Sequence, residues 1–469
     1  MATVTNDSTL RSLCIYNPDL STKEGTEDKK ILYYYPHDDS LNRKVRNIGL
    51  CEALVNFTRT FHPRRPCEAV HTEKMRQVFL EPEENHWMVM SVTIPWAEVI
   101  SNGEKSIVYY EDHVQDSVLE ASLTTMYLTF KFFNGSFGSI VDSHGLEGLK
   151  KRMDMFLTRY IMSMDVGKLD IFTVFQGIQF LPLDKYMYLK VHCFVNLIET
   201  TFRSIQRTVL VYNDQLVWSG LEQADIKVFY QYLLSWLLPQ DPSPTMQTMS
   251  SIAASVKSVV GTTSSQTGRF LIGDEGSVRV GVAGVGDGGK APWVYIHMDG
   301  SVQSCKLYVY TAGNALMCFF VQREKASPSS DFCKRLNTFL GPRLAQISRE
   351  ISDFRDKSKP QGLDPQYRFI YFNEMNLAVK SPLLSRRSTY VNILSEAMKL
   401  LADINSEYDS IEEGETIMRT LGDSWVVTRK SGHRRFFVVL NQKSANFAEI
   451  NEEVRKLCQK EFTNIFFLD

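Results

Sequence analysis

A strand, a second strand and a helix follow one another at residues 208–238, and this order constrains the fold of the whole chain. The runs 208–212 and 215–218 are β-branched and aromatic, and the Asn213-Asp214 pair between them tolerates the positive φ of a tight hairpin. Apolar residues then recur at helical spacing after Gly220, and Pro239 ends the pattern. We therefore predict a β-hairpin that leads into an amphipathic helix.

The same order of elements appears in two other parts of the chain. Residues 11–18 and 29–36 predict two strands before a helix at 41–61, and residues 367–372 and 377–379 predict two strands before a helix at 391–404. Further strands and one or two helices follow in each copy, although the copies share little sequence identity. This order is typical of an antiparallel sheet covered by helices, so the fold class is α+β. The layout resembles the longin, or roadblock-like, arrangement.

The predicted organisation has three longin domains. The first spans 1–165, the second spans 166–239 and 269–356, and the third spans 366–469, with a Ser/Thr-rich linker at 240–268. Within the first domain the patterns predict strands near 68–79, 86–95 and 106–110 and helices near 112–133 and 146–163. In the second domain they predict two separate helices, at 330–339 and 342–354.

The length, the net charge and the cysteine content of the chain are typical of a soluble protein of several domains. At 469 residues the chain is too long for a single core, and domains of about 150 residues are the usual expectation. A net charge of -2 argues against bulk binding of nucleic acid. Eight scattered cysteines without a CxxC pattern are expected to be reduced, and no apolar run predicts a signal peptide or a membrane span. We therefore expect a cytoplasmic protein.

The sequence predicts no catalytic, metal or cofactor site. Histidines are isolated, and adjacent acidic residues fall in expected loops, where solvated charge is the favoured interpretation. Residues 281–290, GVAGVGDGGK, match the phosphate-loop patterns GxxxxGK and GxGxxG, but Ala291, Pro292 and a strand follow. Because a phosphate loop needs a helix to begin at once, we favour a flexible loop over a nucleotide-binding enzyme.

Distinctive segments are spread over almost the whole chain: RSLCIYNPDL, KKILYYYP, VRNIGLCEALVNFTRTF, EPEENHWMVM, VYNDQLVWSGLEQ, FIYFNEMNLA, LNQKSANFAEINEEVRKLC and TNIFFLD. These segments resemble animal members of the Ccz family, the smaller partner in the Mon/Ccz complex. The resemblance implies three longin domains and an obligate heterodimer with a Mon subunit. It implies that the complex is a guanine nucleotide exchange factor for the late-endosomal Rab GTPase Rab seven, and that the chain performs no covalent chemistry.

The resemblance also implies a cellular setting. The expected role is endosome maturation, vesicle-mediated transport and fusion with the lysosome or vacuole, including autophagosomes. The chain is expected to be a peripheral protein of late endosome and lysosome membranes, and a third regulatory subunit is expected in animals. The rival function is a longin scaffold or adaptor, in which the Mon subunit alone performs exchange.

The helix expected at 41–61 carries two apolar stripes on nearly opposite sides. One stripe consists of Leu50, Leu54, Phe57 and Phe61, and the other of Leu41, Val45, Ile48 and Val55. One stripe can cover the sheet of its own domain, which leaves the other for the Mon subunit; the alternative is a helix sandwiched inside its own domain. The resemblance implies that the contacts with the Mon subunit and with the Rab GTPase lie on the first domain. The predicted partner and GTPase interface comprises Asn42, Lys44, Val45, Arg46, Asn47 and Ile48.

Two stretches are candidates for contact with a phosphoinositide-containing or other anionic membrane. One helical face of the linker carries Met249, Ile252, Val256 and Val259 opposite Ser and Thr, which suits loosely packed membranes; the alternative is a disordered linker. The second stretch is a basic hairpin turn with Arg429, Lys430, Arg434 and Arg435, which could hold anionic head groups; the alternative is a solvated hairpin tip.

Overall fold

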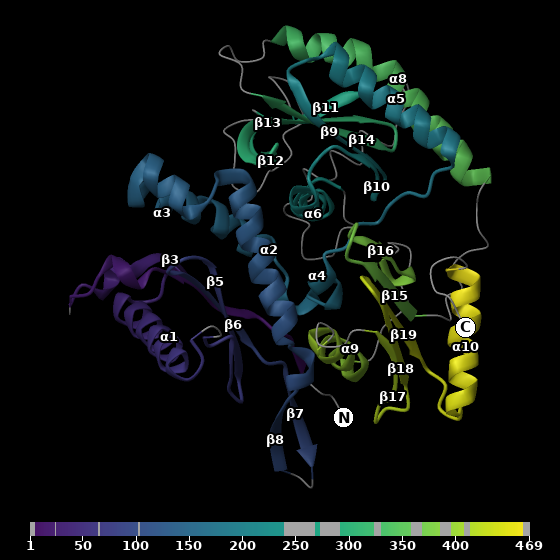
Figure 1. Cartoon of the computed structure of the whole chain (residues 1–469). Coiled ribbons are helices and arrows are strands. Elements are labelled where there is room, and N and C mark those ends of the chain that lie inside the picture. Colours follow the sequence, from purple (N-terminus) through teal and green to yellow (C-terminus); the bar gives the residue numbers. More distant parts are fainter. Residues whose placement is uncertain are drawn as a thin grey trace.

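Three antiparallel sheets, formed by successive parts of the chain, are the framework of the protein (Figure 1). The structure is a computed structural model that describes residues 5–23, 25–63, 66–101, 104–238, 268–272, 291–322, 330–357, 368–384, 395–407 and 413–462. Each sheet and the helices on it make one module, and the predicted α+β class is confirmed. The domain boundaries given above remain a proposal. The linker at 240–268, except Gly268, and the glycine-rich loop at 281–290 lie outside the described residues.

The first module is built on five strands in the order β3-β2-β6-β5-β4. These are β2 (Leu10–Tyr16), β3 (Ile31–Tyr35), β4 (Ala69–His71), β5 (Met75–Glu83) and β6 (His86–Thr93). On β2, Leu13 and Ile15 face the largest core, whereas Cys14 and Tyr16 face a smaller cluster on the other side. Both faces of this sheet are therefore covered by apolar side chains of other elements.

The strands that follow the first helix differ from the prediction. The stretch 68–79 holds two strands, because the chain turns at Thr72, whose N–H donates to the carbonyl oxygen of Met75 at 3.0 Å. The strand predicted at 106–110 is β8 (Glu104–Tyr109), which pairs with β7 (Trp96–Ser101). Together with β1 (Thr5–Asn6) they form a separate three-stranded sheet. Strand propensity located β5, β6 and β8, but it predicted no strand at β1 or β7 and did not show which sheet each strand joins.

The second and third sheets repeat the spatial order of the first. The second contains β9 (Ile205–Tyr212), β10 (Gln215–Ser219), β11 (Arg269–Ile272), β12 (Trp293–Met298), β13 (Ser301–Ala312) and β14 (Ala315–Gln322). The third contains β15 (Arg368–Asn373), β16 (Ala378–Lys380), β17 (Gly414–Arg419), β18 (Trp425–Ser431) and β19 (Arg434–Leu440). In all three sheets the first strand lies between the second and the last, so the predicted repeat is one of topology.

Helices follow the second strand and the last strand of each module. Those after the second strand are α1 (Leu41–Phe61), α6 (Gln223–Tyr232) and α9 (Ser395–Glu407). Those after the last strand are α2 (Asp116–Asn134), α3 (Phe137–Ser163), α8 (Ser330–Lys357) and α10 (Phe447–Glu461), and the second module also has α4 (Ile171–Phe175) and α5 (Lys185–Thr201). The hairpin predicted from the runs 208–212 and 215–218 is confirmed as β9 and β10, with Asn213 at φ 56°.

The two helices predicted at 330–339 and 342–354 are one helix, because α8 continues through Pro342. Pro342 cannot donate to the preceding turn, a loss that costs about 3 kcal/mol in a helix interior. An unbroken stripe on both sides of the proline packs into the core of the second module: Leu336, Leu340, Leu344, Ile347 and Ile351. Burial of these side chains at about 1.5–3 kcal/mol each exceeds the cost of the proline.

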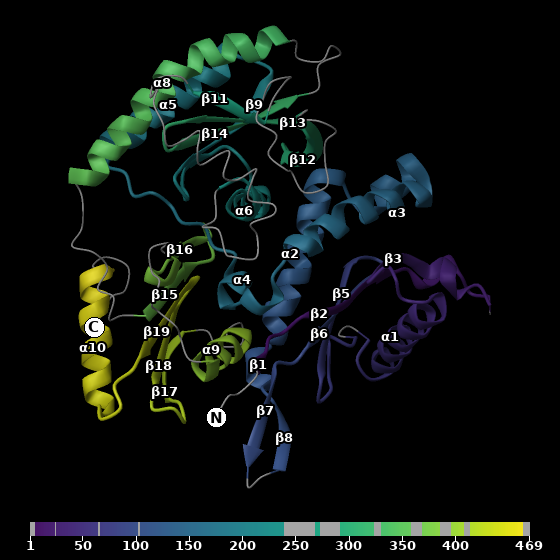
Figure 2. The ribbon, with the colours of Figure 1, turned by 180° about the vertical axis from the view of Figure 1, so that it is seen from behind.

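The first module is oriented differently from the other two. The side of its sheet that faces the centre of the molecule corresponds to the side that faces outward in the second and third modules. In the second and third modules α6 and α9 face the shared core, and α8 and α10 lie outside (Figures 1 and 2). In the first module α2 faces the centre, where it contacts β5, β12, α6 and α9, and α1 lies outside. One apolar core thus joins all three modules, and α1 is the outward counterpart of α6 and α9.

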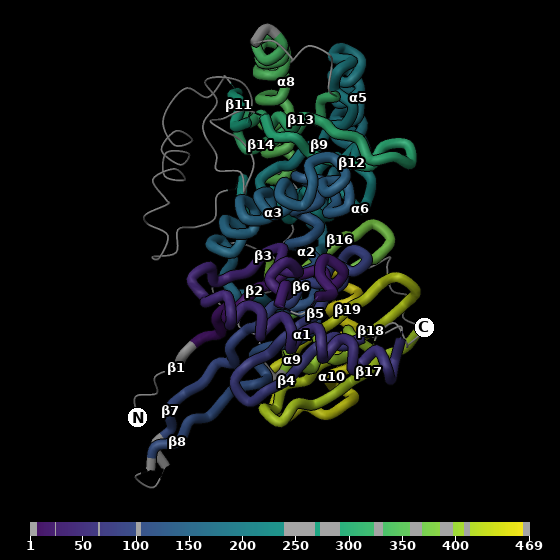
Figure 3. The backbone as a smooth tube through the Cα atoms, turned by 90° about the vertical axis from the view of Figure 1, so that its left-hand side faces the viewer, coloured from purple at the N-terminus to yellow at the C-terminus, as the bar shows by residue number. Residues whose placement is uncertain are grey.

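A short extended segment joins the second sheet to the third. Ile178 N–H donates to the carbonyl oxygen of Leu377, beside β16, and Leu181 N–H donates to the carbonyl oxygen of Leu216 on β10. This segment bridges two sheets instead of joining one. Figure 3 shows the resulting arrangement, with the second module stacked over the first and the third.

Candidate functional site

The outward face of α1 is the candidate functional site, and its inward face explains how the helix is held. Ile48, Cys51 and Val55 recur at helical spacing and are buried among the smaller cluster of the first module. Two ion pairs fasten the flanks: Lys30 Nζ lies 2.8 Å from Glu52 Oε2, and Arg59 Nη2 lies 3.0 Å from Glu81 Oε2. The helix therefore sits in a fixed orientation on its sheet.

Apolar side chains also line the side of α1 that faces away from the sheet. Leu50, Phe57 and Phe61 are 56%, 62% and 74% exposed, and we call these three residues the outer stripe. The rings of Phe57 and Phe61 meet edge to face with centroids 5.0 Å apart. Burial of such side chains contributes about 1.5–3 kcal/mol each, so three of them left in solvent mark a surface suited to a protein partner.

The predicted stripe of Leu50, Leu54, Phe57 and Phe61 faces outward except for Leu54, which packs partly against the cluster beneath α1. The other stripe faces the sheet except for Leu41, which is exposed at the start of the helix. The alternative of a helix sandwiched within its own domain does not describe α1, because the outer stripe is more than half exposed in the described part of the chain.

The six residues predicted for the partner and GTPase interface have different surroundings. Asn42 and Arg46 are exposed, and Arg46 precedes Leu50 by four residues, so it extends the outer stripe. Lys44 Nζ donates to the carbonyl oxygen of His37 at 2.7 Å, and Asn47 Nδ2 donates to the hydroxyl of Tyr34 at 3.2 Å.

Val45 is half-buried and Ile48 is buried, so these two side chains face the sheet. Since Lys44, Asn47 and Ile48 anchor the helix, Asn42 and Arg46 are the predicted residues that a partner can reach most directly.

The basic residues predicted to form one turn do not gather on one surface. They lie in β18 and β19, where neighbouring side chains point to opposite faces. Arg429 reaches toward α10 and contacts Glu415 at 3.0 Å, whereas Arg435 reaches toward α9 and contacts Glu374 and Asn405. Because carboxylates offset the charges of Arg429 and Arg435, a head-group site made of all four residues is not formed. Lys430 is half-buried and Arg434 is exposed.

The linker residues predicted to touch a membrane, Met249, Ile252, Val256 and Val259, lie outside the described residues. Among the helices that the structure describes, none combines the length and the apolar character needed to cross a bilayer. In the same described ranges, no three or more His, Cys, Asp or Glu side chains lie together in a way that would hold a metal ion.

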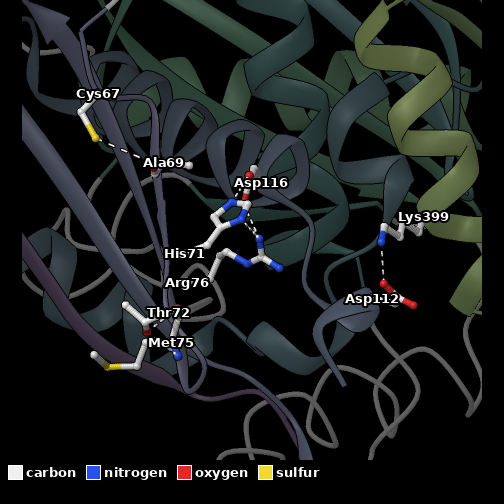
Figure 4. Close-up of polar contacts among 9 residues, drawn as sticks. All are labelled: Cys67, Ala69, His71, Thr72, Met75, Arg76, Asp112, Asp116 and Lys399. Atoms are coloured by element: carbon white, nitrogen blue, oxygen red, sulfur yellow. Dashed lines mark hydrogen bonds and ion pairs between the residues drawn. The ribbon is translucent and has the colours of Figure 1, made fainter. Parts of the chain in front are cut away.

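Sequence patterns did not point to the polar joint between the first and third modules (Figure 4). His71 Nε2 lies 2.6 Å from Asp116 Oδ2 at the start of α2, and Arg76 contacts both residues. Lys399 on α9 donates to Asp112 at 2.6 Å, and this bond raises the pKa of Lys399. The residues of the pair are 287 positions apart in the chain, so only the folded structure brings them together.

Comparisons with known proteins agree with this architecture. The model described as "First Longin domain of INTU, CCZ1 and HPS4" matches residues 10–135, and the models for Intu longin-like domains 2 and 3 match residues 205–341 and 364–457. Each of the three sheets thus belongs to a longin-like domain, which confirms the predicted three-longin fold.

Proteins named "Vacuolar fusion protein CCZ1 homolog" are similar over their full length. The Nematostella vectensis protein is 42% identical, and the match covers 100% of both chains. The Xenopus laevis protein is 40% identical over 98% of this chain and 97% of its own. The Dictyostelium discoideum protein is 30% identical over 98% of both chains.

Proposed function

Because the chain belongs to the family of vacuolar fusion protein CCZ1 homologues, we propose that it acts in fusion at the vacuole, lysosome and late endosome as a subunit of an exchange factor. The complex contains a Mon subunit and activates the late-endosomal Rab GTPase Rab seven. In animals a third regulatory subunit joins it. The complex works in endosome maturation, vesicle transport and autophagosome fusion, as a peripheral assembly on late endosome and lysosome membranes.

Nucleotide exchange of this kind requires shaped surfaces and no covalent chemistry. A factor that binds the nucleotide-free GTPase more tightly than the loaded GTPase weakens nucleotide binding by the same free energy. A fold of three rigid modules around one core suits this task, because a surface held by shared packing can distort a bound switch region without deforming itself.

The observation that carries the proposal is the outward position of α1. Its counterparts α6 and α9 are buried against the shared core, whereas the outer stripe on α1 is exposed. In the proposed complex the Mon subunit covers this stripe, and the exposed Asn42 and Arg46 at the start of the helix lie near the GTPase.

Membrane recruitment is the second part of the proposal. The linker face with Met249, Ile252, Val256 and Val259 would insert into loosely packed lipid as an amphipathic helix. Anionic lipids would add the attraction of exposed basic residues such as Arg434. Vesicle flotation of the complex with Ile252→Asp and Val256→Asp tests the linker, and undiminished binding would remove it as an anchor.

Nucleotide release from the Rab GTPase tests the exchange function. It is measured with a fluorescent guanine nucleotide and with this chain alone, the Mon subunit alone, or both together. Shared catalysis predicts rapid release only with both subunits. Equal release with the Mon subunit alone would instead favour the scaffold or adaptor function, in which the longin domains only hold partners.

A further inference from the structure

The β7–β8 hairpin is an addition to the first module. In the third module the last strand of the sheet, β19, leads to α10 with no strand in the described residues between them. In the first module β6 is followed by β7 and β8 before α2 begins. The hairpin projects from the body of the molecule (Figures 1 and 3). The strand order common to all three sheets does not require it.

Among the described side chains of the hairpin, those at its base contribute to the core. Ile94 and Ala97 are buried at the base, whereas Ile107 and Val108 on β8 are 54% and 40% exposed. Neighbouring residues of a strand point to opposite faces, so β8 presents an apolar side chain to solvent on each face. The strand also lies at the edge of its sheet, in the order β1-β7-β8.

The hydrogen-bond register shows which main-chain groups of β8 face outward. Tyr110 N–H donates to the carbonyl oxygen of Pro95 at 2.8 Å. Because facing residues of an antiparallel pair alternate between bonded and non-bonded, Val108 and Ser106 also turn their N–H and C=O groups toward β7. Ser106 Oγ donates to the carbonyl oxygen of Val99 at 3.2 Å, in agreement with this register.

Lys105, Ile107 and Tyr109 therefore direct their N–H and C=O groups away from β7. Within the described residues no hydrogen-bond partner is found for these groups. The result is a row of main-chain donors and acceptors on a strand that is exposed on both faces, the geometry to which an extended chain can be added.

We propose that β8 accepts an extended segment of a partner protein as a fourth strand. An extended chain is the occupant that fits, because it offers main-chain donors and acceptors at the same spacing as β8. The main-chain N–H and C=O groups of a helix are already bonded to one another within the helix. Apolar side chains on neighbouring positions of the added strand would cover Ile107 on one face and Val108 on the other. An acidic residue would face Lys105, whose side chain is 75% exposed and whose ammonium lies 3.9 Å from the carboxylate of Glu98. This surface is separate from the outer stripe of α1 and does not depend on nucleotide exchange.

Residue-resolved hydrogen exchange of the full chain tests the proposal. The probe is a short synthetic peptide of alternating valine and threonine with one central glutamate. In the free chain the amides of Lys105, Ile107 and Tyr109 exchange rapidly, and those of Ser106 and Val108 exchange slowly. Saturating peptide is expected to slow the outward set by about tenfold or more, with the inner set unchanged.

Two controls isolate main-chain pairing. Ile107→Pro removes an outward N–H without breaking the bonds to β7, so it is expected to weaken peptide binding about tenfold. Ile107→Ala retains the N–H and is expected to bind within about threefold of the natural chain, since only side-chain contacts are reduced.

Three results would overturn the proposal. The first is equal binding by a peptide that carries N-methyl groups on all of its residues, since these block both of its edges. The second is the absence of selective protection at saturating peptide. The third is a dimer of the chain that Ile107→Pro disrupts, since that result would assign β8 to a second copy of this chain.

Discussion

Gly177 lies so close to Val379 that a β-carbon on the glycine would come within 2.5 Å of the Val379 β-carbon. Gly177 directly precedes the segment that bonds to the edge of the third sheet through Ile178 and to β10 through Leu181. This contact fixes how near the bridging segment approaches β16. The second and third modules are thus joined by main-chain pairing that only a residue without a side chain permits.

Gly177→Ala is expected to destabilise the chain by about 1–3 kcal/mol, the usual cost of forcing an extra methyl group into a packed site. Gly49→Ala is the matched control, because Gly49 lies in α1 with open space around it. That change should stabilise the helix by about 0.5–1 kcal/mol. Urea unfolding measures both. Equal effects from the two substitutions would show that Gly177 does not set the approach of the sheets.

The bond between Lys399 and Asp112 predicts a measurable but small coupling between the third and first modules. Both side chains are about half exposed, so solvent screening limits the pair to less than about 1 kcal/mol. A double-mutant cycle with Lys399→Met and Asp112→Asn should give about 0.5 kcal/mol at low salt and less at high salt. A coupling of zero at low salt would contradict a structural role for the pair.

The sign of the pH dependence of this pair follows from Lys399. Its hydrogen bond to Asp112 raises the pKa of Lys399 in the folded chain above the ordinary lysine value of 10.5. The contribution of Lys399 to the free energy of unfolding is therefore fully present at neutral pH. It is lost only as the pH rises through the folded-state pKa of Lys399. Lowering the pH from 8 to 6 should leave the effect of Lys399→Met unchanged.

Asp170 predicts a pH dependence in the acid range. Its carboxylate accepts a hydrogen bond from Phe172 N–H at 3.0 Å and caps α4, but burial raises the pKa of Asp170 above 3.8. Because the carboxyl pKa is raised, protonated Asp170 contributes to the stability of the folded chain below pH 3.8. This contribution is lost as the pH rises through the folded-state pKa. Ionised Asp170 therefore costs stability at neutral pH.

Asp170→Asn keeps an acceptor for the cap and removes the charge, so it should unfold at a higher urea concentration than the natural chain at pH 7. The extra stability of Asp170→Asn over the natural chain should shrink as the pH approaches 3.8. Asp170→Ala is the control, since loss of the cap should cost about 1 kcal/mol at neutral pH. A destabilised Asp170→Asn at pH 7 would show that the charge is favourable.

Local signals in the sequence were sufficient for much of the fold. The Asn213-Asp214 turn, the repeated order of elements and the two stripes of α1 depend on neighbouring residues, and the structure agrees with each. Contacts between distant residues were not predictable in this way. Asp225, near the start of α6, accepts hydrogen bonds from His297, 72 residues away, and no local pattern links these two residues.

The candidate site shows the same division. The sequence predicted an apolar stripe that is available to a partner. It did not show that Lys44 bonds to the carbonyl of His37 or that Arg429 pairs with the carboxylate of Glu415, because only the fold brings these groups together. The orientation of the first module, with α2 inside and α1 outside, also follows from packing among all three modules. It has no signature in any single segment.

The affinity of this chain for the Mon subunit tests the central claim most directly. The comparison is between the natural chain, Leu50→Asp with Phe57→Asp, and Leu197→Asp, which changes a side chain of α5 that is 46% exposed. We predict binding about a hundredfold weaker for the outer-stripe variant, or about 3 kcal/mol. The α5 variant should bind within about threefold of the natural chain, the span expected for a side chain outside the interface. Thermal unfolding should be the same for all three chains. Equal affinity of all three would contradict the assignment of the outer stripe as the partner surface.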